Sequence, residues 1–351
     1  MLGEITIAEP VTRTLLDKLL DATREAVLIV RGRDLRIIAA NDAALRAFSI
    51  RGAPLTGQKL GDRIAHEELI RSFRGACVHG HITDIHIKHK TVTTRRYDVH
   101  LAPLELDGLP HAVGYFYDVT QVHRLENIRQ EFLSNISHEL RTPLTSILAF
   151  VETLEDGALE DAENNRHFLS VIRRNAERMR NLIAEILELS QIEAGNVVLE
   201  KTAVNMPVIV DDIMTNLSSM AAAREITLKD QIPADFTVMA DRKRLEQMLT
   251  NLIDNAIRFN RRGGSVTATA KRSGDRCLIS ISDTGEGIGP KEMRRVFERF
   301  YRVDRARTRE VGGTGLGLAI VKHLARLHGG EVFVESDLGV GTTFTIDIPA
   351  D

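Results

Sequence analysis

The most informative stretch of this sequence is Phe132-Leu-Ser-Asn-Ile-Ser-His-Glu-Leu-Arg-Thr-Pro-Leu-Thr145. It lies in a run of apolar residues that recur in steps of three and four, the period of an amphipathic α-helix. On such a helix His138 is two residues from Ile136 and from Leu140, about 200° around the axis, so it points away from the apolar face. We therefore expect a solvent-facing imidazole. The apolar residues are Val122, Leu125, Ile128, Phe132, Ile136, Leu140, Leu144, Ile147, Leu148, Val151 and Leu154.

A second apolar stripe follows after a polar stretch, residues 155–165, which we expect to be a loop. The two stripes predict an antiparallel helical hairpin. Two helices bury too little apolar surface alone, so the hairpin predicts a four-helix bundle with a second copy, and hence a homodimer. Pro143 lacks a backbone donor and should bend the first helix. The second stripe is Phe168, Val171, Ile172, Met179, Leu182, Ile183, Ile186 and Leu189.

The patterns on either side of the hairpin differ from it, so the sequence predicts a multidomain chain with domains at 14–120, 121–194 and 200–351. The first should be an α+β unit, a small antiparallel sheet flanked by short helices. The third should be an α/β sandwich, one sheet covered by helices on a single face.

The expected elements follow from local patterns. In the first domain a helical pattern opens at residues 15–20, strands are expected at 26–30, 37–40, 81–90, 95–104 and 111–119, and a helix at 66–77. In the third, strands are expected at 225–230, 236–240, 265–271, 277–283, 330–335 and 342–349, and helices at 207–224, 242–260, 290–298 and 316–328.

The composition excludes several classes of protein. Lys and Arg number 46 against 49 Asp and Glu, a net charge of -3, which argues against a nucleic-acid partner. Cys77 and Cys277 form no CxxC pair, as expected of a reduced cytosolic protein. No stretch approaches the roughly 18 apolar residues of a membrane helix, and residues 1–10 lack the basic start of a signal peptide. We expect a cytoplasmic chain; a soluble protein and a piece separated from a membrane anchor both remain open.

Amide side chains recur four residues apart at Gln247, Asn251 and Asn255. Placed on one helix face, they suit a cluster of Mg²⁺ and phosphate, because oxygen ligands match this hard cation. An ordinary exposed polar face is the alternative.

Two glycine-rich segments follow. Asp283-Thr-Gly285-Glu-Gly287-Ile-Gly289 comes directly after an expected strand, and its glycines allow close approach of the backbone while its carboxylate can accept from an amine such as that of adenine. Gly312-Gly-Thr-Gly315-Leu-Gly317-Leu318 opens an expected helix, a suitable place for phosphate. No GK[ST] follows, so it is not a P-loop.

Together and in this order, the motifs resemble those of sensor histidine kinases of two-component systems, over residues 122–349. His138-Glu139-x-x-Thr142-Pro143 resembles the H box. The segment 241–256 resembles the N box, 283–289 the G1 box, Phe297-Glu-Arg-Phe-Tyr-Arg302 the F box and 312–318 the G2 box. Residues 339–344 resemble the closing glycine motif.

The resemblance implies an ATP-dependent protein-histidine kinase with ATP and Mg²⁺ as cofactors. His138 would be phosphorylated and would pass the phosphoryl group to an aspartate of a response regulator receiver domain. Glu139 would hydrogen-bond or deprotonate the imidazole, and Thr142 would position water for removing phosphate from the partner, so that phosphatase activity accompanies the kinase. The segment at 194–205 would hinge, because acceptor and nucleotide lie on separate domains.

The resemblance also implies the nucleotide contacts. Asn255 would bind Mg²⁺, Asn251 and Arg258 would face the phosphates, and Asp283 would accept from the adenine amine. Residues 302–312 would form a mobile lid. Arg258 stands where lysine is commoner and Phe259 where tyrosine is frequent, which puts nucleotide affinity in doubt. The other implied nucleotide-binding residues are Gly285 and Gly287 beside the base, Gly313, Gly315 and Gly317 around the triphosphate, and Tyr301, Arg302, Leu316 and Thr343.

Residues 14–120 resemble a PAS sensor domain in Ala26-Val-Leu-Ile-Val30, Ile37-Ile-Ala-Ala-Asn-Asp-Ala-Ala44 and Tyr117-Asp-Val-Thr120. The last motif runs directly into the first hairpin helix, so a signal could pass as a small shift of that helix. Seven of the twelve histidines lie between His66 and His111. A metal, haem or pH-sensing role stands against solvated strand faces and loops, and the sensor ligand is unknown.

Three alternatives compete with this interpretation. A related ATPase with the same nucleotide fold, as in gyrase or mismatch-repair proteins, lacks the HExxT-Pro helix pair. A non-catalytic scaffold would not need every catalytic position to be filled. A regulator dominated by its phosphatase activity differs only in the balance of two activities, which the sequence leaves open.

Overall fold

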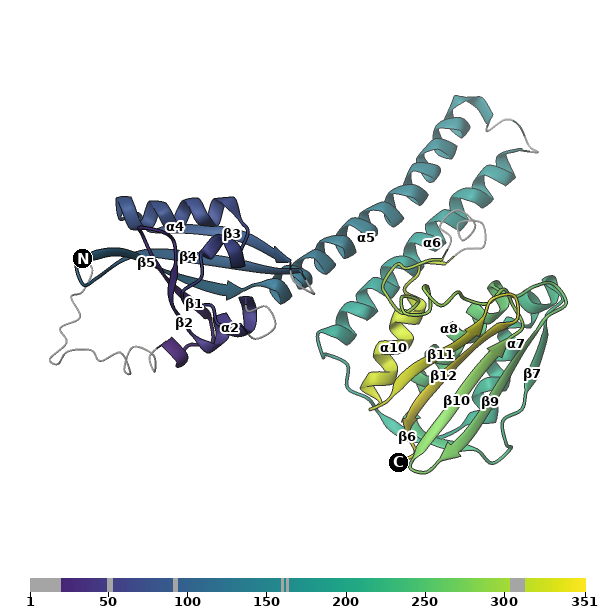
Figure 1. The fold of residues 1–351 in the computed structure, drawn as a ribbon. Coiled ribbons are helices and arrows are strands. Elements are labelled where there is room, and N and C mark those ends of the chain that lie inside the picture. Colours follow the sequence, from purple (N-terminus) through teal and green to yellow (C-terminus); the bar gives the residue numbers. More distant parts are fainter. Residues whose placement is uncertain (1–19, 49–52, 91–93, 159–160, 162–163, 304–312) are drawn as a thin grey trace. The chain divides into compact units, whose positions relative to one another are not determined.

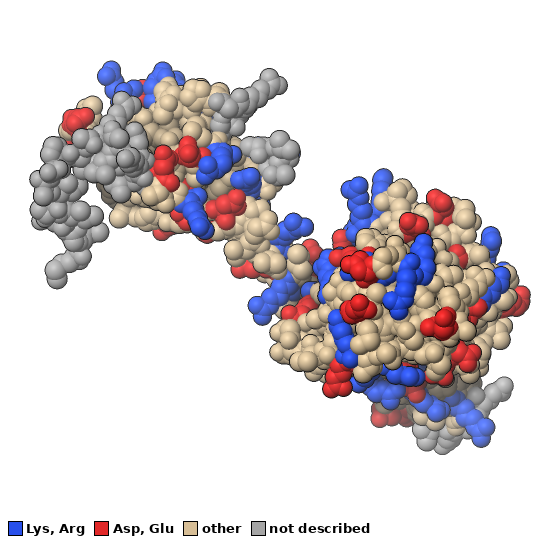
Figure 2. Space-filling model, turned by 90° about the horizontal axis from the view of Figure 1, so that it is seen from below, with Lys and Arg blue, Asp and Glu red and all other residues tan. Residues whose placement is uncertain are grey.

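The computed structural model describes residues 20–48, 53–90, 94–158, 161, 164–303 and 313–351 (Figure 1). The chain forms two compact units, Met1–Glu131 and Phe132–Asp351. Among the described residues, no helix is long and apolar enough to cross a membrane. On the face drawn in Figure 2, basic and acidic side chains are interspersed, in keeping with the nearly balanced charge.

The first unit is built around an antiparallel sheet with strand order β2-β1-β5-β4-β3. Along β4, Tyr97, Val99 and Leu101 are buried and alternate with less buried residues, so one sheet face packs on the helices. The α+β prediction is confirmed; the predicted helical start at residues 15–19 lies outside the described residues. The elements are β1 (Ala26–Arg31), β2 (Ile37–Ala40), α2 (Asp42–Phe48), α3 (Leu60–Arg63), α4 (Glu67–His79), β3 (Thr83–Lys90), β4 (Thr94–Leu106) and β5 (Leu109–Asp118).

The helix α4 packs closely on the sheet because β5 has a glycine where they meet. A Cβ on Gly114 would lie 2.6 Å from the Phe73 ring. The helix is bounded by His66, whose imidazole accepts from the backbone N–H of Leu69, and by Gly80, which takes the left-handed conformation (φ 68°).

The predicted hairpin is present as α5 (Thr120–Thr153) and α6 (Asn164–Glu193). The helix α5 continues through the buried Pro143 without a break. The segment expected to be a loop begins instead with a π-helical turn, Leu154–Ala158.

The second unit contains a five-stranded sheet with order β11-β12-β10-β9-β7, in which only β7 and β9 are parallel. The helices α7, α8 and α10 lie on one face of this sheet (Figure 1), as predicted. The elements are β6 (Lys201–Asn205), α7 (Met206–Ala223), β7 (Thr227–Asp230), β8 (Thr237–Asp241), α8 (Arg242–Arg258), β9 (Ser265–Ser273), β10 (Arg276–Asp283), α10 (Gly317–Leu327), β11 (Glu331–Asp337) and β12 (Gly341–Pro349).

The strand expected at 236–240 is present as β8, which pairs with β6 in a separate two-stranded sheet. Two other predictions for this unit were wrong. Part of the expected linker at 194–205 is therefore the strand β6, which places Val204 in the core. The helix expected at 290–298 is a series of turns, in which bonds that span three residues, such as that from Glu298 N to Arg295 O (2.8 Å), alternate with bonds that span four, such as that from Val296 N to Glu292 O (3.1 Å).

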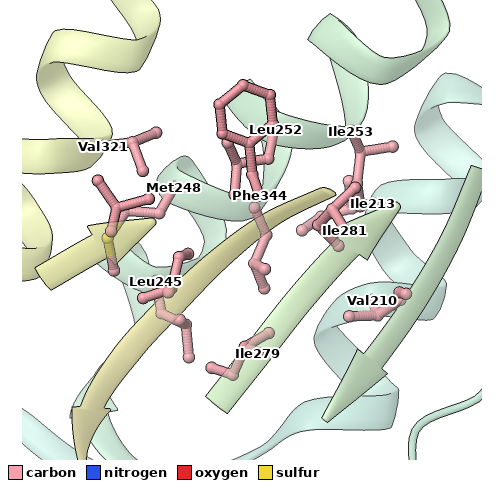
Figure 3. Close-up of a cluster of buried hydrophobic side chains, with 14 of the residues drawn as sticks. Val210, Ile213, Leu245, Met248, Leu252, Ile253, Ile279, Ile281, Val321 and Phe344 are labelled. Carbon is pink, nitrogen blue, oxygen red and sulfur yellow. The ribbon is translucent and has the colours of Figure 1, made fainter. Parts of the chain in front are cut away.

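Packing of α8 against the sheet fixes the position of its polar face. Figure 3 shows Leu245, Met248, Leu252 and Ile253 of α8 among side chains from α7, α10, β10 and β12. All four are fully buried, and each such side chain contributes roughly 1.5–3 kcal/mol. The opposite face of α8, with its amides, is thereby held toward the glycine segments.

Candidate functional site

His138 is exposed on α5, as predicted, and so are Ser134 and Thr142 one turn before and after it. The hydroxyl of Thr142 donates to the backbone oxygen of His138 (3.2 Å). An imidazole in this position is open to a reaction partner from the solvent side.

Glu139, the next residue, is half-buried and faces the rest of the second unit. Its Oε2 accepts from Nη2 of Arg302 (3.1 Å) and from Nη2 of Arg178 on α6 (3.4 Å). Nη2 of Arg302 also donates to the backbone oxygen of Gly313. The structure thus places Arg302, predicted at the nucleotide, against the acidic residue beside His138. Residues 304–312 of the predicted lid lie outside the described residues.

The amide row of α8 lies next to the start of α10. The side chain of Asn251 donates to the backbone oxygen of Gly317 (3.4 Å). Arg258 pairs with Asp254 on the preceding turn, with Nε 2.6 Å from the carboxylate. Asp241 caps α8 by accepting from the backbone N–H of Arg244 (3.1 Å). Asn255 lies between Asn251 and Arg258 on the same half-buried face.

Asp283, at the end of β10, has a carboxylate fixed by the backbone. Its Oδ1 accepts from the N–H of Gly285 (2.8 Å) and of Thr342 (3.3 Å). Burial raises the pKa of this carboxyl, and the two backbone N–H groups lower it by less. Thr343, the next residue on β12, bonds through its hydroxyl to Ser282 (2.9 Å).

Two glycines of the first segment, Gly285 and Gly287, are required by the fold itself. A Cβ on Gly285 would lie 2.4 Å from the backbone oxygen of Phe259. A Cβ on Gly287 would lie 2.1 Å from the backbone oxygen of Asp337, and the φ of Gly287 is 70°. These positions are closed to other residues whether or not a ligand is bound.

The glycines of the second segment differ among themselves. Gly315 has φ 74°, and a Cβ there would lie 2.9 Å from the backbone of Phe300. A Cβ on Gly313 would meet no atom of the described residues within 4 Å, and one on Gly317 would be in ordinary contact with Asn251. Among the described residues, therefore, no close approach of another group requires a glycine at Gly313 or Gly317.

Leu316 and Tyr301, two further residues predicted at the nucleotide, also have defined contacts. Leu316 is fully buried immediately before α10, and its N–H donates to the hydroxyl of Thr314 (3.2 Å). The guanidinium of Arg295 lies over the ring of Tyr301, 4.3 Å from its centroid. The N-terminus of α10 offers the partial positive charge that favours phosphate.

The acidic residues of α6 were missed by sequence reasoning. Glu185 accepts from the hydroxyl of Thr314, and Glu188 pairs with Arg244 and Gln247. They belong to no motif, and a polar residue on an amphipathic helix carries no signal of what it will face.

The histidines of the first unit form local pairs. On the sheet, His86 meets Asp98 and His100 meets Asp84, each at 2.6 Å between facing strands. Among the described residues, no group of three or more His, Cys, Asp or Glu side chains could hold a metal ion.

Three family models match the chain. Residues 240–351 match "Histidine kinase-, DNA gyrase B-, and HSP90-like ATPase", residues 128–195 match "His Kinase A (phospho-acceptor) domain", and residues 20–124 match "PAS fold".

Among curated proteins, Sensor histidine kinase WalK of Bacillus subtilis is 36% identical over 247 residues, 70% of this chain and 40% of that protein. Sensor-like histidine kinase SenX3 of Mycobacterium tuberculosis is 37% identical over 239 residues, 68% of this chain and 58% of that protein. The chain thus spans about half the length of these relatives.

Among solved structures, histidine kinase ThkA has a TM-score of 0.53 and 23% identity, covering 93% of this chain and 96% of that chain. Histidine kinase AdeS of Acinetobacter baumannii has a TM-score of 0.52 and 24% identity, covering 61% of this chain and 98% of that chain. These two likenesses show the fold. The exposed His138 on its hairpin, the ATPase fold beside it and the three matching models agree, and the chain belongs to the sensor histidine kinases of two-component systems.

Proposed function

We propose that this chain is an ATP-dependent protein-histidine kinase that phosphorylates itself on His138 and passes the phosphoryl group to an aspartate of a response regulator. The observation that carries the proposal is the exposed His138, beside Glu139, in the same compact unit as the amide row of α8 and the glycine segments. Sensing is assigned to residues 14–120, dimerisation and phosphotransfer to 121–194, and nucleotide binding to 200–351.

The adenine would be recognised by Asp283. Both backbone contacts to this carboxylate use Oδ1, which leaves Oδ2 to accept from the exocyclic amine. Gly285 and Gly287 would flank the base and Thr343 would lie at the same sheet edge. The triphosphate would extend toward Gly313, Gly315 and Gly317, which lie just before and at the start of α10. Leu316, Tyr301 and Arg302 would complete this wall.

The donor set on α8 fits a magnesium ion. Asn255 offers an amide oxygen on the same face as Asn251, and hard oxygen donors suit Mg²⁺. When bound, the ion would offset negative charge on the phosphates. Arg258, held by Asp254, and Asn251, held by Gly317, are positioned to bind phosphate oxygens.

The transfer itself requires mainly positioning and neutralisation of charge. His138 provides the nucleophile, since a neutral imidazole has a free ring nitrogen. Glu139 accepts or orients the imidazole proton after its carboxylate has separated from Arg178 and Arg302. Thr142, one turn further on, is placed to orient water for hydrolysis of the phosphorylated partner, the basis of an accompanying phosphatase activity.

The hairpin is proposed to form a homodimer. In the second unit, large apolar side chains remain exposed on α5 and α6, at 44–60% of their surface. A second hairpin would cover them and complete a four-helix bundle. These side chains are Leu133, Leu144, Leu148, Leu169, Ile183 and Leu187.

A response regulator is the proposed partner. The solved structure of ThkA is of a complex with response regulator protein TrrA, which supports the same class of partner here. The exposed face around His138 is accessible to it. No nucleic-acid partner is proposed, and the ligand of the sensor domain is unknown.

The test is to incubate the full chain with γ-labelled ATP and Mg²⁺ and to examine the label in acid and alkali. We expect an acid-labile, alkali-stable label, as for phosphohistidine, which His138→Ala abolishes without loss of ATP binding. Asn255→Ala should remove both labelling and Mg²⁺-dependent binding.

His167→Ala is the matched control, because His167 is an exposed histidine on the other helix of the hairpin. It should label like the unaltered chain. Label that survives His138→Ala would contradict the assignment of the acceptor.

A further inference from the structure

Glu185 of α6 has no part in the proposed reaction, yet it contacts the segment assigned to the triphosphate. Its carboxylate accepts from the hydroxyl of Thr314, which lies between Gly313 and Gly315. The same hydroxyl accepts from the N–H of Leu316 at the start of α10. The carboxylate is therefore next to the place where the glycine segment would meet phosphate.

Glu188, three residues further along α6, makes the matching contact with α8. One oxygen pairs with Arg244 and the other accepts from the side-chain amide of Gln247. Gln247 is the residue one turn before Asn251 in the amide row. Two carboxylates of one helix thus reach both walls of the proposed phosphate site, α8 and the glycine segment.

These contacts are fixed by apolar packing. Leu182, Leu189 and Ile192 of α6 are only 0–4% exposed. They belong to the same hydrophobic core as Leu316 and as the buried face of α8. Because the apolar residues hold α6 in place, Glu185 and Glu188 cannot leave the site while this packing persists.

Charges of both signs surround Glu185. Burial raises the pKa of Glu185, and the neighbouring negative charges of Glu188 and Asp254 raise it further, while Thr314 and Arg258 act in the opposite direction. Arg258 is also a proposed phosphate ligand, so its positive charge attracts both the carboxylate of Glu185 and the phosphates. A triphosphate entering this region meets the same negative charges, of Glu188 and Asp254, that oppose the ionisation of Glu185.

We propose that Glu185 competes with the phosphates of the nucleotide for the Thr314 segment, so that packing of α6 on the catalytic part and nucleotide binding oppose each other. The inference rests on the proposed function, because it takes ATP as the ligand. The apparent affinity for nucleotide is the intrinsic affinity multiplied by the fraction of molecules in which Glu185 has left Thr314. Any event that moves α6 away from Thr314 would raise that affinity, and bound nucleotide would loosen the packing to the same degree.

The test measures binding of Mg²⁺–ADP and of a Mg²⁺-loaded, non-hydrolysable ATP analogue to the full chain by calorimetry. Glu185→Ala removes both the contact and the charge and should tighten binding by about three- to tenfold. Glu177→Ala is the matched control, an exposed glutamate two turns earlier on α6, and should bind like the unaltered chain. Glu185→Gln keeps the size of the side chain and removes its charge, so it should tighten binding by a smaller factor.

Equal affinities for the unaltered chain, Glu185→Ala and Glu177→Ala would overturn the competition and leave the proposed function standing. If Glu185→Ala does not fold, equal affinity of Glu185→Gln and the unaltered chain overturns the competition in the same way. An unaltered chain and a Glu177→Ala variant that bind neither nucleotide would contradict the proposed function, and this inference with it.

Discussion

Nη2 of Arg302 lies 3.1 Å from Oε2 of Glu139, the residue next to His138. Arg302 is the last residue of the segment 297–302, which precedes the second glycine segment in the sequence. Its side chain is only 6% exposed. The same nitrogen donates to the backbone oxygen of Gly313. One guanidinium therefore joins the hairpin, at the position beside the acceptor, to the proposed phosphate segment.

Arg302→Met should destabilise the second unit. A hydrogen bond to a charged group contributes about 1.5–3 kcal/mol. After its loss, Arg178 is the one arginine of this pair that still contacts Glu139. The check is the thermal midpoint of unfolding, which should fall. Arg180→Met, at an exposed position on α6, should leave the midpoint nearly unchanged, because exposed charges contribute little. Equal midpoints for the two variants would show that the buried contact has no net effect.

Nucleotide affinity should depend on the ionisation of Asp283. The ionised carboxylate accepts from the adenine amine, and burial raises the pKa of this group in the free protein. Affinity should therefore begin to fall at a higher pH than for an ordinary aspartate, and should keep falling as the pH decreases. Asp283→Asn should weaken Mg²⁺–ADP binding by about 10–100-fold, the equivalent of one hydrogen bond to a charged group, and should flatten the pH profile.

The control for this experiment is Asp275→Asn, an exposed aspartate in the turn before the same strand. It should keep both the affinity and the pH profile of the unaltered chain. A profile that Asp283→Asn leaves unchanged would mean that another group governs adenine binding.

His328 should make the stability of the second unit depend on pH. Its Nδ1 donates to the backbone oxygen of Leu324 (2.8 Å), and its Nε2 accepts from the backbone N–H of Asp241 (3.2 Å). Burial lowers the pKa of this imidazole. Because the unfolded chain takes up a proton near pH 6.5 and the folded chain does not, this contribution is complete above that pH and is lost as the pH falls toward the lowered pKa.

The measurement is the thermal midpoint between pH 5 and 8. His328→Gln should be less stable than the unaltered chain at pH 8, and the difference should narrow on acidification, by about 1.4 kcal/mol for each unit by which the pKa is lowered. His167→Gln, at an exposed position, should show no such narrowing. A constant difference at every pH would mean that His328 does not titrate with folding.

The hairpin and the two five-stranded sheets could be predicted because most of their apolar residues recur at helical or strand spacing. The exposure of His138 followed from the same period, since two residues on a helix that are two positions apart face nearly opposite sides. The turns at 290–298 could not be distinguished from a helix, because Met293, Val296 and Phe297 have helical spacing, whereas only some of the backbone bonds there span the four residues of an α-helix.

The contacts of Glu139, Glu185 and Glu188 were also beyond prediction. Each depends on which helix face meets the catalytic part, a tertiary relationship that leaves no local pattern. For β6, the alternation of five mostly polar residues was too short to separate a strand from a linker. The roles assigned to individual nucleotide-binding residues stay predictions.

Two glycines near the proposed adenine site allow the demands of the fold to be separated from those of the ligand. Both Gly287 (φ 70°) and Gly339 (φ 80°) are left-handed, but only at Gly287 would a Cβ strike backbone, 2.1 Å from Asp337 O. Gly339→Ala should therefore cost only the left-handed strain, roughly 1–2 kcal/mol. Gly287→Ala should lower the thermal midpoint by clearly more, with no nucleotide present, because β11 and the segment after β10 must separate. If the two variants unfold at the same temperature, the close approach of backbone at Gly287 is not what requires a glycine there, and contact with the adenine ring becomes the better reason.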